Sequence, residues 1–299
     1  MSEKKMRCAI IGPGNIGMNL LTKLRRSRLL ECGLFVGRDS KSKNLKIAQD
    51  KGYFVSFESL QGLINYQDRF DILFDATNAD SHRITAGVMK KLGKYVIDLT
   101  PSKVGKLCIP CLNMEEGLET DNINMVTCGG QSTVPFAYAI TRACEKVTYA
   151  ETVSTIASAS AGIGTRENID DYIQTTQQAL NQFTNIENTK SMIVLNPADP
   201  PIIMHNTLYM KTENPDMDAL VKNVYDMEQT MRLYVPGIKI LVPPTDIGDG
   251  IIALSIQVEG TGDYLPEYAG NLDIITCAAI EMAEKYAIKI METESGCIF

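Results

Sequence analysis

The sequence is poor in histidine. Only two histidines, His82 and His205, occur among its 299 residues. Zinc sites and Ser-His-Asp triads both draw on histidine, so we expect neither, and we predict no metal site. His82 falls in a polar stretch after an apolar run, where a histidine more often caps a helix than takes part in catalysis.

Basic residues are also fewer than acidic ones. The chain has 29 Lys and Arg and 36 Asp and Glu, which gives a net charge of -7. A nucleic-acid-binding protein normally carries a basic face, so this balance argues against one. No apolar run is long enough to cross a bilayer, and residues 1–12 lack the apolar core and cleavage site of a signal peptide. We therefore expect a cytoplasmic protein that binds neither nucleic acid nor membranes.

The eight cysteines, from Cys8 to Cys297, are scattered along the chain. Without an export signal they are expected to be reduced thiols. Cys108 and Cys111 form a C-x-x-C pair that lacks a second pair of metal ligands and the helix N-terminus of a redox site, so we interpret it as structural. Four others are expected to fill core space as small apolar side chains: Cys8, Cys32, Cys144 and Cys277.

The arrangement of apolar runs changes near residue 147. The first half alternates short apolar runs with helical patterns, as in β-α-β units around a parallel sheet; its predicted strands are 7–11, 34–36, 70–74, 95–99 and 125–127, with a helix at 15–27. The second half has longer β-branched strands at 147–156 and 251–258 and helices at 168–181, 217–233 and 272–291. We predict an α/β protein with a Rossmann-type parallel-sheet domain (residues 1–130 and 271–299) and a second, α+β domain (residues 131–270).

Between the first predicted strand and helix lies a glycine-rich loop of the form G-x-G-x-x-G. In such a loop the first glycine allows the tight turn, the second lets the backbone approach a pyrophosphate, and the third allows the helix to pack closely on the strand. The anion then lies on the N–H groups at the helix start. A purely structural turn is the alternative. The predicted dinucleotide-binding residues are Gly12, Pro13, Gly14, Asn15, Ile16 and Gly17.

The second predicted strand is followed by Arg38 and Asp39. An acid at this place binds ribose hydroxyls and favours NAD over NADP, although Asp39 lies somewhat farther from the glycine loop than is usual. Arg38 could instead meet a 2′-phosphate, and both side chains could simply be solvated. We predict NAD as the cofactor.

Cys128 is the candidate nucleophile. It follows the predicted strand 125–127 and precedes two glycines, which would let a substrate carbonyl approach the backbone. Helix-forming residues begin at Val134, so the thiol would lie near a helix N-terminus, a position that lowers a thiol pKa and offers N–H donors to an oxyanion. A buried structural cysteine is the alternative, and the loop setting favours the nucleophile.

The motifs together resemble those of the acylating acetaldehyde dehydrogenases that partner 4-hydroxy-2-oxovalerate aldolases in the catabolism of aromatic compounds. The resemblance covers almost the whole chain in order, and its most specific motif is VTCGGQ around Cys128. The matching stretches are IIGPGNIG near the start, FDAT at 74–77, IDLTP at 97–101, NMVTCGGQSTVP at 124–135, SAGIGTRENID at 160–170, LNPADPPIIM at 195–204 and YLPEYAGNLDI at 264–274.

The resemblance implies that an aldehyde, NAD and CoA give an acyl-CoA and NADH. Cys128 would attack the aldehyde to form a thiohemiacetal, and the thioester formed by its oxidation would be taken by CoA. The first domain would then bind NAD and the second would bind substrate and dimerise. Further cofactor contacts are implied for Thr77, for Asn271 at the nicotinamide carboxamide, and for a loop closing over the cofactor: Ser160, Ala161, Gly162, Ile163, Gly164, Thr165, Arg166, Glu167 and Asn168. A helix lead-in is the structural alternative for that loop.

Two departures from the family pattern stand out. Relatives usually carry Arg-Asp where this chain has His205-Asn206, and that aspartate is the proposed general base. Asn206 cannot accept a proton, so either His205 replaces the base or no dedicated base is needed; adjacent strand residues point to opposite faces, so both cannot enter one site. The segment from Pro236 to Gly260 is also shorter than usual, which bears on aldehyde size and oligomerisation.

Two other functions stay open. The chain could reduce a larger acyl-CoA or another activated acid, or it could be a weakened NAD-binding partner of an aldolase. In the preferred hypothesis the partners are a short aldehyde or acyl-CoA, an aldolase of the 4-hydroxy-2-oxovalerate type and a second copy of the chain.

Overall fold

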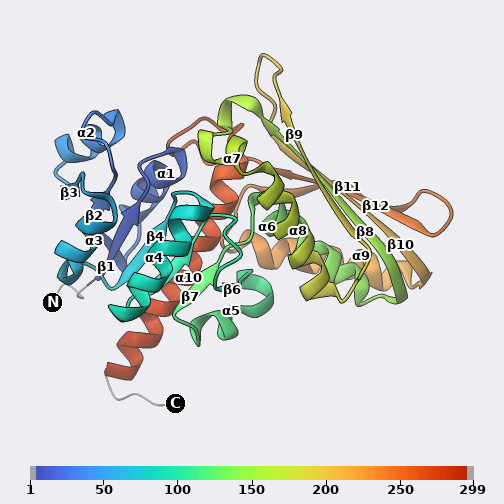
Figure 1. Cartoon of the computed structure of the whole chain (residues 1–299). Coiled ribbons are helices and arrows are strands. Elements are labelled where there is room, and N and C mark those ends of the chain that lie inside the picture. The colour runs from blue at the N-terminus through green and yellow to red at the C-terminus, as the bar shows by residue number, and fades with distance from the viewer. Residues whose placement is uncertain (1–4, 295–299) are drawn as a thin grey trace. The chain divides into compact units, whose positions relative to one another are not determined.

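The computed structural model describes residues 5–294, and its internal contacts divide the chain into two compact units. Unit 1 comprises the residues up to Met125 together with those from Thr276 onward, and unit 2 spans Val126–Ile275. In Figure 1 unit 1 runs from blue to teal and returns in red, while unit 2 runs from green to orange. None of the helices formed by residues 5–294 is both long and apolar enough to cross a membrane.

Unit 1 is built on a parallel sheet with strand order β3-β2-β1-β4-β5-β7-β6. The strands are β1 (Met6–Ile11), β2 (Leu30–Val36), β3 (Val55–Ser56), β4 (Ile72–Asp75), β5 (Tyr95–Asp98), β6 (Lys106–Leu107) and β7 (Asn122–Asn124). The helices are α1 (Asn15–Leu24), α2 (Lys43–Asp50), α3 (Ser59–Asn65), the 3-10 helix η1 (Gln67–Arg69), α4 (Ala79–Lys91), α5 (Pro110–Leu118) and most of α10 (Gly270–Glu294). The predicted Rossmann-type α/β fold is confirmed.

The core of unit 1 explains why these segments form strands. Every residue of β4 and β5 is buried, as expected for parallel strands that are covered on both faces. Burial of a large apolar side chain stabilises the fold by about 1.5–3 kcal/mol. One cluster of such side chains comes from the central strands and their helices: Ala9, Ile11, Leu34, Val36, Leu63, Phe70, Leu73, Met89 and Val96.

The predicted strand at 125–127 is wrong, because β7 ends at Asn124 and the next three residues have no regular structure. Val126 has a φ of 60°, which no strand can contain and which costs a β-branched residue about 1–3 kcal/mol. The predicted helix 15–27 also ends early, since α1 stops at Leu24. The strand predicted at 251–258 is present with those bounds, and the other predicted strands and helices are present with shifted ends.

Unit 2 is built on a mixed sheet with strand order β11-β12-β10-β8-β9, in which only β8 and β9 are parallel neighbours. The strands are β8 (Cys144–Ala157), β9 (Thr189–Asn196), β10 (Met204–Pro215), β11 (Ile238–Asp246) and β12 (Ile251–Val258). The helices are α6 (Cys128–Thr141), the 3-10 helix η2 (Ser158–Ser160), α7 (Ile163–Glu167), α8 (Ile169–Thr184) and α9 (Met217–Arg232).

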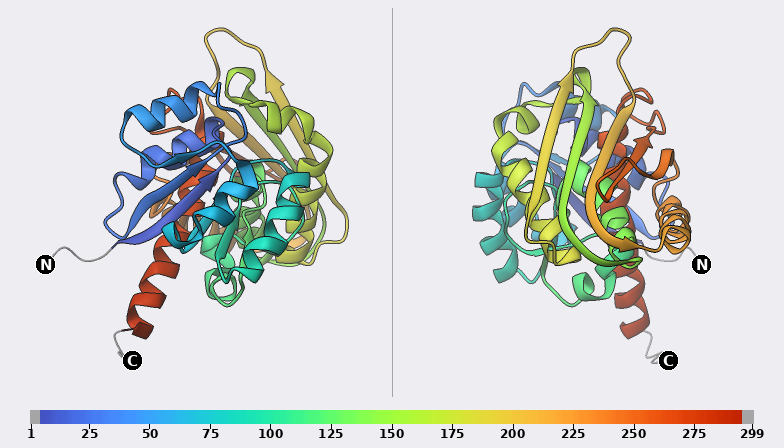
Figure 2. Two further views of the ribbon diagram at one scale, coloured as in Figure 1. Left: turned by 60° about the vertical axis from the view of Figure 1, so that its left-hand side comes forward. Right: turned by 90° about the vertical axis from the view of Figure 1, so that its right-hand side faces the viewer.

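Burial alternates along the strands of unit 2. In β12 and β10 every second residue is buried, because α6, α8 and α9 pack on one face of the sheet only. The right view of Figure 2 shows the other face, with no helix in front of β8, β9 and β10. Apolar side chains remain exposed on β9 and β11, among them Val194, Leu241 and Val242. This half-covered arrangement is the α+β architecture predicted for the second half of the chain.

Helix α10 contributes to both units. Its first six residues, 270–275, belong to unit 2, and the helix continues into unit 1 from Thr276. Within unit 1 it bonds to the first helix and the turn after it, since Asn19 Nδ2 donates to Thr276 Oγ1 at 3.1 Å and Ser27 Oγ donates to Glu284 Oε1. The end of the described chain therefore completes the unit with which the chain begins.

Candidate functional site

The glycine loop of unit 1 has the geometry that its sequence predicts. Gly12 has a φ of 104°, and a Cβ there would lie 2.4 Å from the carbonyl oxygen of Ala76. A Cβ on Gly17 would lie 2.0 Å from the carbonyl oxygen of Gly12, so helix α1 packs directly on the turn. At Gly14 no atom lies within 4 Å of such a Cβ. Two glycines are thus required by packing, and the middle one borders open space.

The start of α1 offers its backbone N–H groups without a side-chain cap. Gly14 is the N-cap residue and gives no side-chain cap to the first turn, which contains Asn15, Ile16 and Gly17. The carbonyl of Pro13 accepts a hydrogen bond from Asn44 Nδ2 at 2.7 Å, which fixes the turn to α2. This arrangement suits an anion at the positive end of the helix.

Two neighbouring loops meet the glycine loop in unit 1. The peptide that joins Ala76 to Thr77 lies against Gly12, so Thr77 is at the same edge of the sheet as the dinucleotide loop. The loop after β2 approaches Pro13 through Gly37 and carries Arg38 and Asp39, which are both exposed. The carboxylate of Asp39 accepts from the backbone N–H of Lys41 at 2.8 Å.

In unit 2, Cys128 is the first residue of helix α6, which begins six residues before the predicted Val134. Thr127 caps this helix, because its Oγ1 accepts from Gly130 N at 2.8 Å. The same hydroxyl contacts Thr176 Oγ1 at 2.7 Å, and Thr176 donates to the carbonyl oxygen of Tyr172. A chain of buried hydroxyls thus fixes the start of α6 to the first turns of α8.

The hydroxyl group of Tyr172 lies beside the thiol of Cys128. The Cys128 thiol lies 3.8 Å from the Tyr172 hydroxyl oxygen, which also accepts a hydrogen bond from Gly129 N at 3.0 Å. Burial raises the pKa of Cys128 to about 11, although the Tyr172 hydroxyl and the N–H groups of Gly129 and Cys128 act to lower it. The expectation of a lowered thiol pKa is therefore wrong, because desolvation outweighs the helix start.

The glycines after Cys128 serve packing. A Cβ on Gly129 would lie 2.1 Å from Tyr172 Oη and 2.3 Å from Ser154 Oγ, and a Cβ on Gly130 would lie 2.5 Å from Val126 Cγ1. Their N–H groups are both engaged by side-chain oxygens, Gly129 N by Tyr172 and Gly130 N by Thr127. The space beside each glycine is filled by protein atoms rather than left open to a substrate.

Asn206 and His205 lie on opposite faces of the sheet in unit 2. Asn206 is fully buried on the face that the helices cover, and its register partner on β8 is Ser154, which contacts Gly129. Among the described residues neither Oδ1 nor Nδ2 of Asn206 has a hydrogen-bond partner. His205 is half-buried on the uncovered face, beside Thr155 and Gln257. Only Asn206 therefore points toward the layer that contains Cys128.

The segment from Ser160 to Asn168 is closer to the helix lead-in than to an open loop. Its residues Ile163–Glu167 form the short helix α7, with Gly162 as N-cap. Arg166 folds back and donates to the carbonyl oxygens of Ser158 and Ala161. Asn168 Nδ2 donates to the carbonyl oxygen of Gly164 at 2.7 Å. Two of the polar side chains suggested for the cofactor are thus bonded to the segment's own backbone.

Asn271 lies in the first turn of α10, in the part of that helix that belongs to unit 2. Its side chain is 7% exposed, and its Oδ1 has no hydrogen-bond partner among the described residues. A buried amide oxygen without a partner costs free energy, so it marks a place where a ligand N–H can bind.

Three expectations about other residues need correction. His82 is not in a loop, because Asn78 caps α4 and His82 is a fully buried residue in its first turns. Cys111 does lie at a helix N-terminus, that of α5. Of the four supposed core cysteines only Cys8 is fully buried, and Cys32, Cys144 and Cys277 are partly exposed. None of the seven described cysteines forms a disulfide, and Cys297 lies outside the described residues.

Tyr172 was missed by sequence reasoning because it lies 44 residues from Cys128. One signal was available: the helix-facing stripe of α8 contains polar residues where a core would place apolar ones. Its buried members are Tyr172, Thr175, Thr176, Ala179 and Leu180.

Comparison with known proteins identifies the family. The family model for the dimerisation domain of prokaryotic acetaldehyde dehydrogenase matches residues 128–266. An acetaldehyde dehydrogenase of Spirochaeta aurantia is 46% identical over 287 residues, covering 96% of each chain. Another, of Pectobacterium atrosepticum, is 47% identical over 284 residues, covering 94% of this chain and 96% of that one.

The match to a solved structure shows similarity of fold only. The crystal structure of aspartate semialdehyde dehydrogenase II complexed with ASA from Vibrio cholerae matches with a TM-score of 0.64 at 13% identity, over 94% of this chain and 98% of that one. The sequence relatives are far closer and span nearly the full length. This chain therefore belongs to the acetaldehyde dehydrogenase family.

Proposed function

We propose that this protein is an NAD-dependent, CoA-acylating aldehyde dehydrogenase that converts acetaldehyde or another short aldehyde to an acyl-CoA. The observation that carries the proposal is the position of Cys128 at the first residue of α6, with the Tyr172 hydroxyl at its sulfur. In a member of the acetaldehyde dehydrogenase family, a cysteine so placed is the natural nucleophile for an aldehyde.

NAD fits the residues that each unit offers. The pyrophosphate would be held by the backbone from Pro13 to Ile16, since α1 has no side-chain cap and Gly14 borders open space. The partnerless Oδ1 of Asn271 suits the N–H of a carboxamide. When bound, NAD supplies the acceptor for the hydride that leaves the substrate carbon. Unit 1 is accordingly proposed as the NAD-binding domain and unit 2 as the catalytic domain.

Cys128 forms the covalent bond to substrate in this proposal. Its sulfur adds to the aldehyde carbon, and the thiol proton is transferred as the thiohemiacetal forms. After loss of hydride from that carbon and of the proton from its hydroxyl group, a thioester remains on Cys128. The thiol of CoA then attacks the thioester carbon, so that the acyl group leaves as acyl-CoA and the sulfur of Cys128 regains a proton.

The first of these steps is limited by the thiol proton. With a pKa of about 11, roughly one Cys128 in 10⁴ is a thiolate at pH 7. Tyr172 can turn its O–H toward the sulfur and donate to the thiolate once it forms, because its oxygen already accepts from Gly129 N. Asn206, in the place of the family's aspartate, cannot take the proton, so this chain is proposed to work without a dedicated base at that position.

We also propose a homodimer formed through the uncovered face of the sheet in unit 2. Support comes from the apolar residues Val194, Leu241 and Val242 exposed on its strands and from the match to a dimerisation domain over 128–266. A second copy would bury these side chains and strengthen the association. An aldolase of the 4-hydroxy-2-oxovalerate type is a further proposed partner, and its support is the resemblance of the sequence motifs.

The test is NADH formation by the purified protein from acetaldehyde, propionaldehyde and longer aldehydes, with either CoA or phosphate as acyl acceptor. We expect turnover that requires CoA and favours the shortest aldehydes. Turnover with phosphate instead of CoA would point to an acyl-phosphate enzyme. Binding of NAD without turnover of any aldehyde would leave only a nucleotide-binding partner of another enzyme, and the proposal would fail.

A further inference from the structure

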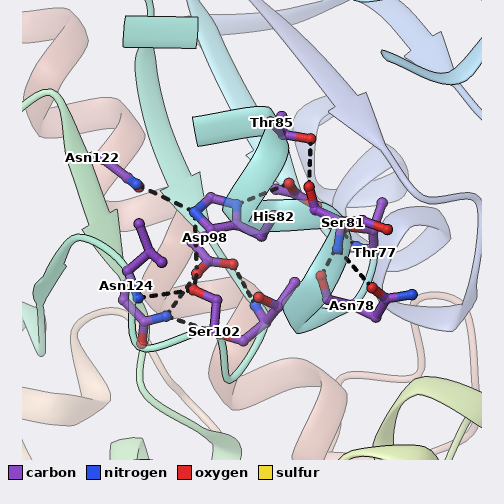
Figure 3. A network of polar contacts seen from close by, with 12 residues as sticks. Thr77, Asn78, Ser81, His82, Thr85, Asp98, Ser102, Asn122 and Asn124 are labelled. Carbon is purple, nitrogen blue, oxygen red and sulfur yellow. Dashed lines mark hydrogen bonds and ion pairs between the residues drawn. The ribbon is translucent and has the colours of Figure 1, made fainter. Parts of the chain in front are cut away.

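A histidine lies between two aspartates in the interior of unit 1. His82, Asp75 and Asp98 are each fully buried. Nδ1 of His82 is 2.9 Å from Asp75 Oδ2, and Nε2 is 3.4 Å from Asp98 Oδ2. Figure 3 shows the ring seated among the ends of the strands, with the side chain of Asn122 at 3.2 Å from Nε2. The proposed chemistry at Cys128 makes no use of this group.

The two aspartates favour the protonated form of the ring. Burial lowers the pKa of His82, but the hydrogen bond to Asp75 and the charges of Asp98 and Asp75 outweigh burial and raise it above the ordinary value. Burial also raises the pKa of Asp98 to about 6, against the lowering effect of His82. A protonated His82 would place a positive charge between the two buried carboxylates.

Each aspartate uses its remaining capacity to hold a loop. Asp75 Oδ1 accepts from the backbone N–H of Thr77 at 3.0 Å and from its hydroxyl. Asp98 Oδ1 accepts from the backbone N–H of Thr100 at 2.7 Å. Asp98 Oδ2 accepts from Ser102 Oγ at 2.6 Å and from Asn124 Nδ2 at 2.7 Å. Through Asp75 and Asp98, His82 therefore joins the loops after β4 and β5 to the end of β7.

The loop held by Asp75 is also the wall of the glycine turn. The carbonyl oxygen of Ala76 and the N–H of Thr77 are the atoms that a Cβ on Gly12 would meet. The path from His82 to the dinucleotide loop is therefore short: ring to Asp75, Asp75 to Thr77, and the peptide of Thr77 to Gly12. Ligands of such sheets bind at the carboxyl ends of the strands, which is the edge that these loops form.

We propose that His82 is a positioning residue for the dinucleotide, which fixes the loops after β4 and β5 against the glycine turn through its bridge between Asp75 and Asp98. The proposal rests on the proposed function in one respect, namely that NAD occupies the glycine loop. His82 itself does not touch the reacting atoms, so its effect should appear in cofactor affinity rather than in turnover at saturating cofactor.

The experiment measures NAD affinity by calorimetry, together with KM and kcat, for the full-length protein and two variants. His82→Gln keeps the side chain polar but removes the ring nitrogens that contact Asp75 and Asp98, and we expect the Kd and KM for NAD to rise about tenfold, as for loss of one charge-assisted hydrogen bond. The kcat at saturating NAD should change less than about threefold. Asp98→Asn keeps the shape of the side chain, provides a second test if His82→Gln fails to fold, and should also weaken NAD binding.

The pH dependence supplies a readout that a purely structural role would not move. The titratable side chains that contact the ring, among the residues described, are Asp75 from β4 and Asp98 from β5. As the pH falls through about 6, Asp98 gains a proton and its hold on the loop weakens. NAD affinity of the parent should decline on that acid limb, and the limb should be absent in Asp98→Asn.

Tyr95→Phe is the matched control, because it removes a buried hydrogen bond to the carbonyl oxygen of Gly117 at the opposite end of β5. It should lower the melting temperature without changing the Kd for NAD. If both His82→Gln and Asp98→Asn bind NAD as tightly as the parent, the inference about His82 is overturned and the proposed function is not. Equal weakening in all three variants, in proportion to lost stability, would also overturn it. A parent that binds no NAD would overturn the proposed function as well.

Discussion

The hydroxyl of Tyr172 accepts a hydrogen bond from the N–H of Gly129 while lying 3.8 Å from the sulfur of Cys128. One oxygen is thus held by the amide next to Cys128, and its hydroxyl group can donate to the sulfur once a thiolate has formed. Because the pKa of Tyr172 is raised well above its ordinary value by burial, this hydroxyl stays protonated wherever the thiol ionises. It can donate a hydrogen bond, but it cannot act as a base.

Replacing Tyr172 by Phe should therefore raise the pKa of Cys128 further. Loss of one hydrogen bond to the thiolate corresponds to about 0.5–1.5 kcal/mol, so alkylation by iodoacetamide at a fixed pH below 10 should slow by about two- to tenfold. In the parent the alkylation rate should rise about tenfold per pH unit up to about pH 11. Tyr149→Phe is the control in the same unit, since Tyr149 bonds to Glu151. Faster alkylation of Cys128 in Tyr172→Phe would contradict this expectation. It would show that the released N–H of Gly129 stabilises the thiolate better than the Tyr172 hydroxyl does.

Cys128→Ser should abolish acyl transfer and leave NAD binding intact. The serine hydroxyl has a far higher pKa than the thiol, and the described residues place no base beside it. The measurement pairs an NAD titration with NADH formation from acetaldehyde and CoA. Turnover near the parent level in this variant would exclude the covalent mechanism.

The position of Asn206 can be tested by restoring the family's aspartate. Asn206→Asp should raise kcat/KM by about 100-fold, the lower end of the range for a general base, because burial raises the pKa of a carboxyl there toward neutrality. A raised pKa favours the protonated, uncharged form, so the variant should lose stability as the pH rises. Its melting temperature should thus fall below that of the parent more at pH 8 than at pH 5.

His205→Ala completes the same experiment. His205 lies on the uncovered face of the sheet, so we expect its removal to leave the rate constants and the acidic limb of the pH profile unchanged. A large loss of rate together with loss of that limb would instead identify His205 as the base. If both variants behave like the parent, this strand takes no part in the chemistry.

Cofactor choice should follow the charge of Asp39. An exposed carboxylate at the ribose end of the loop repels a 2′-phosphate, so kcat/KM should be higher with NAD than with NADP. Asp39→Ser should narrow that preference, with Arg38 then free to attract the phosphate. Equal or better efficiency of the parent with NADP would refute the assignment.

The parts of the site that sequence predicts well are those with local causes. The glycine loop is one, because Gly12 and Gly17 are required by contacts within a single β-α unit. The segment before Cys128 is different: its apolar, β-branched residues favour a strand, yet Val126 is forced to a φ of 60° to turn the chain into α6. That requirement comes from tertiary packing, which propensity does not record.

The contacts of Cys128 and His82 were beyond prediction for a related reason. The start of a helix, taken alone, predicts a lowered pKa for the Cys128 thiol. Burial in the folded chain raises this pKa instead, and local sequence does not show that burial. Likewise His82 lies in a polar stretch that suggests a surface cap, and only the parallel pairing of β4 with β5 brings Asp75 and Asp98 to its two nitrogens. The surroundings of His82 are therefore set by the pairing of strands that are distant in sequence, which the residues next to it do not reveal.

The return of α10 to unit 1 has a consequence for biosynthesis. Unit 2 is continuous, so every residue it needs has been synthesised once Ile275 has left the ribosome. Unit 1 is interrupted, and the partners of Asn19 and Ser27, Thr276 and Glu284, are made after unit 2. The nascent chain can therefore depart from the usual order, in which the domain nearer the N-terminus folds first. The glycine loop emerges before unit 2, yet the helix that follows it gains these partners only after unit 2 has been synthesised.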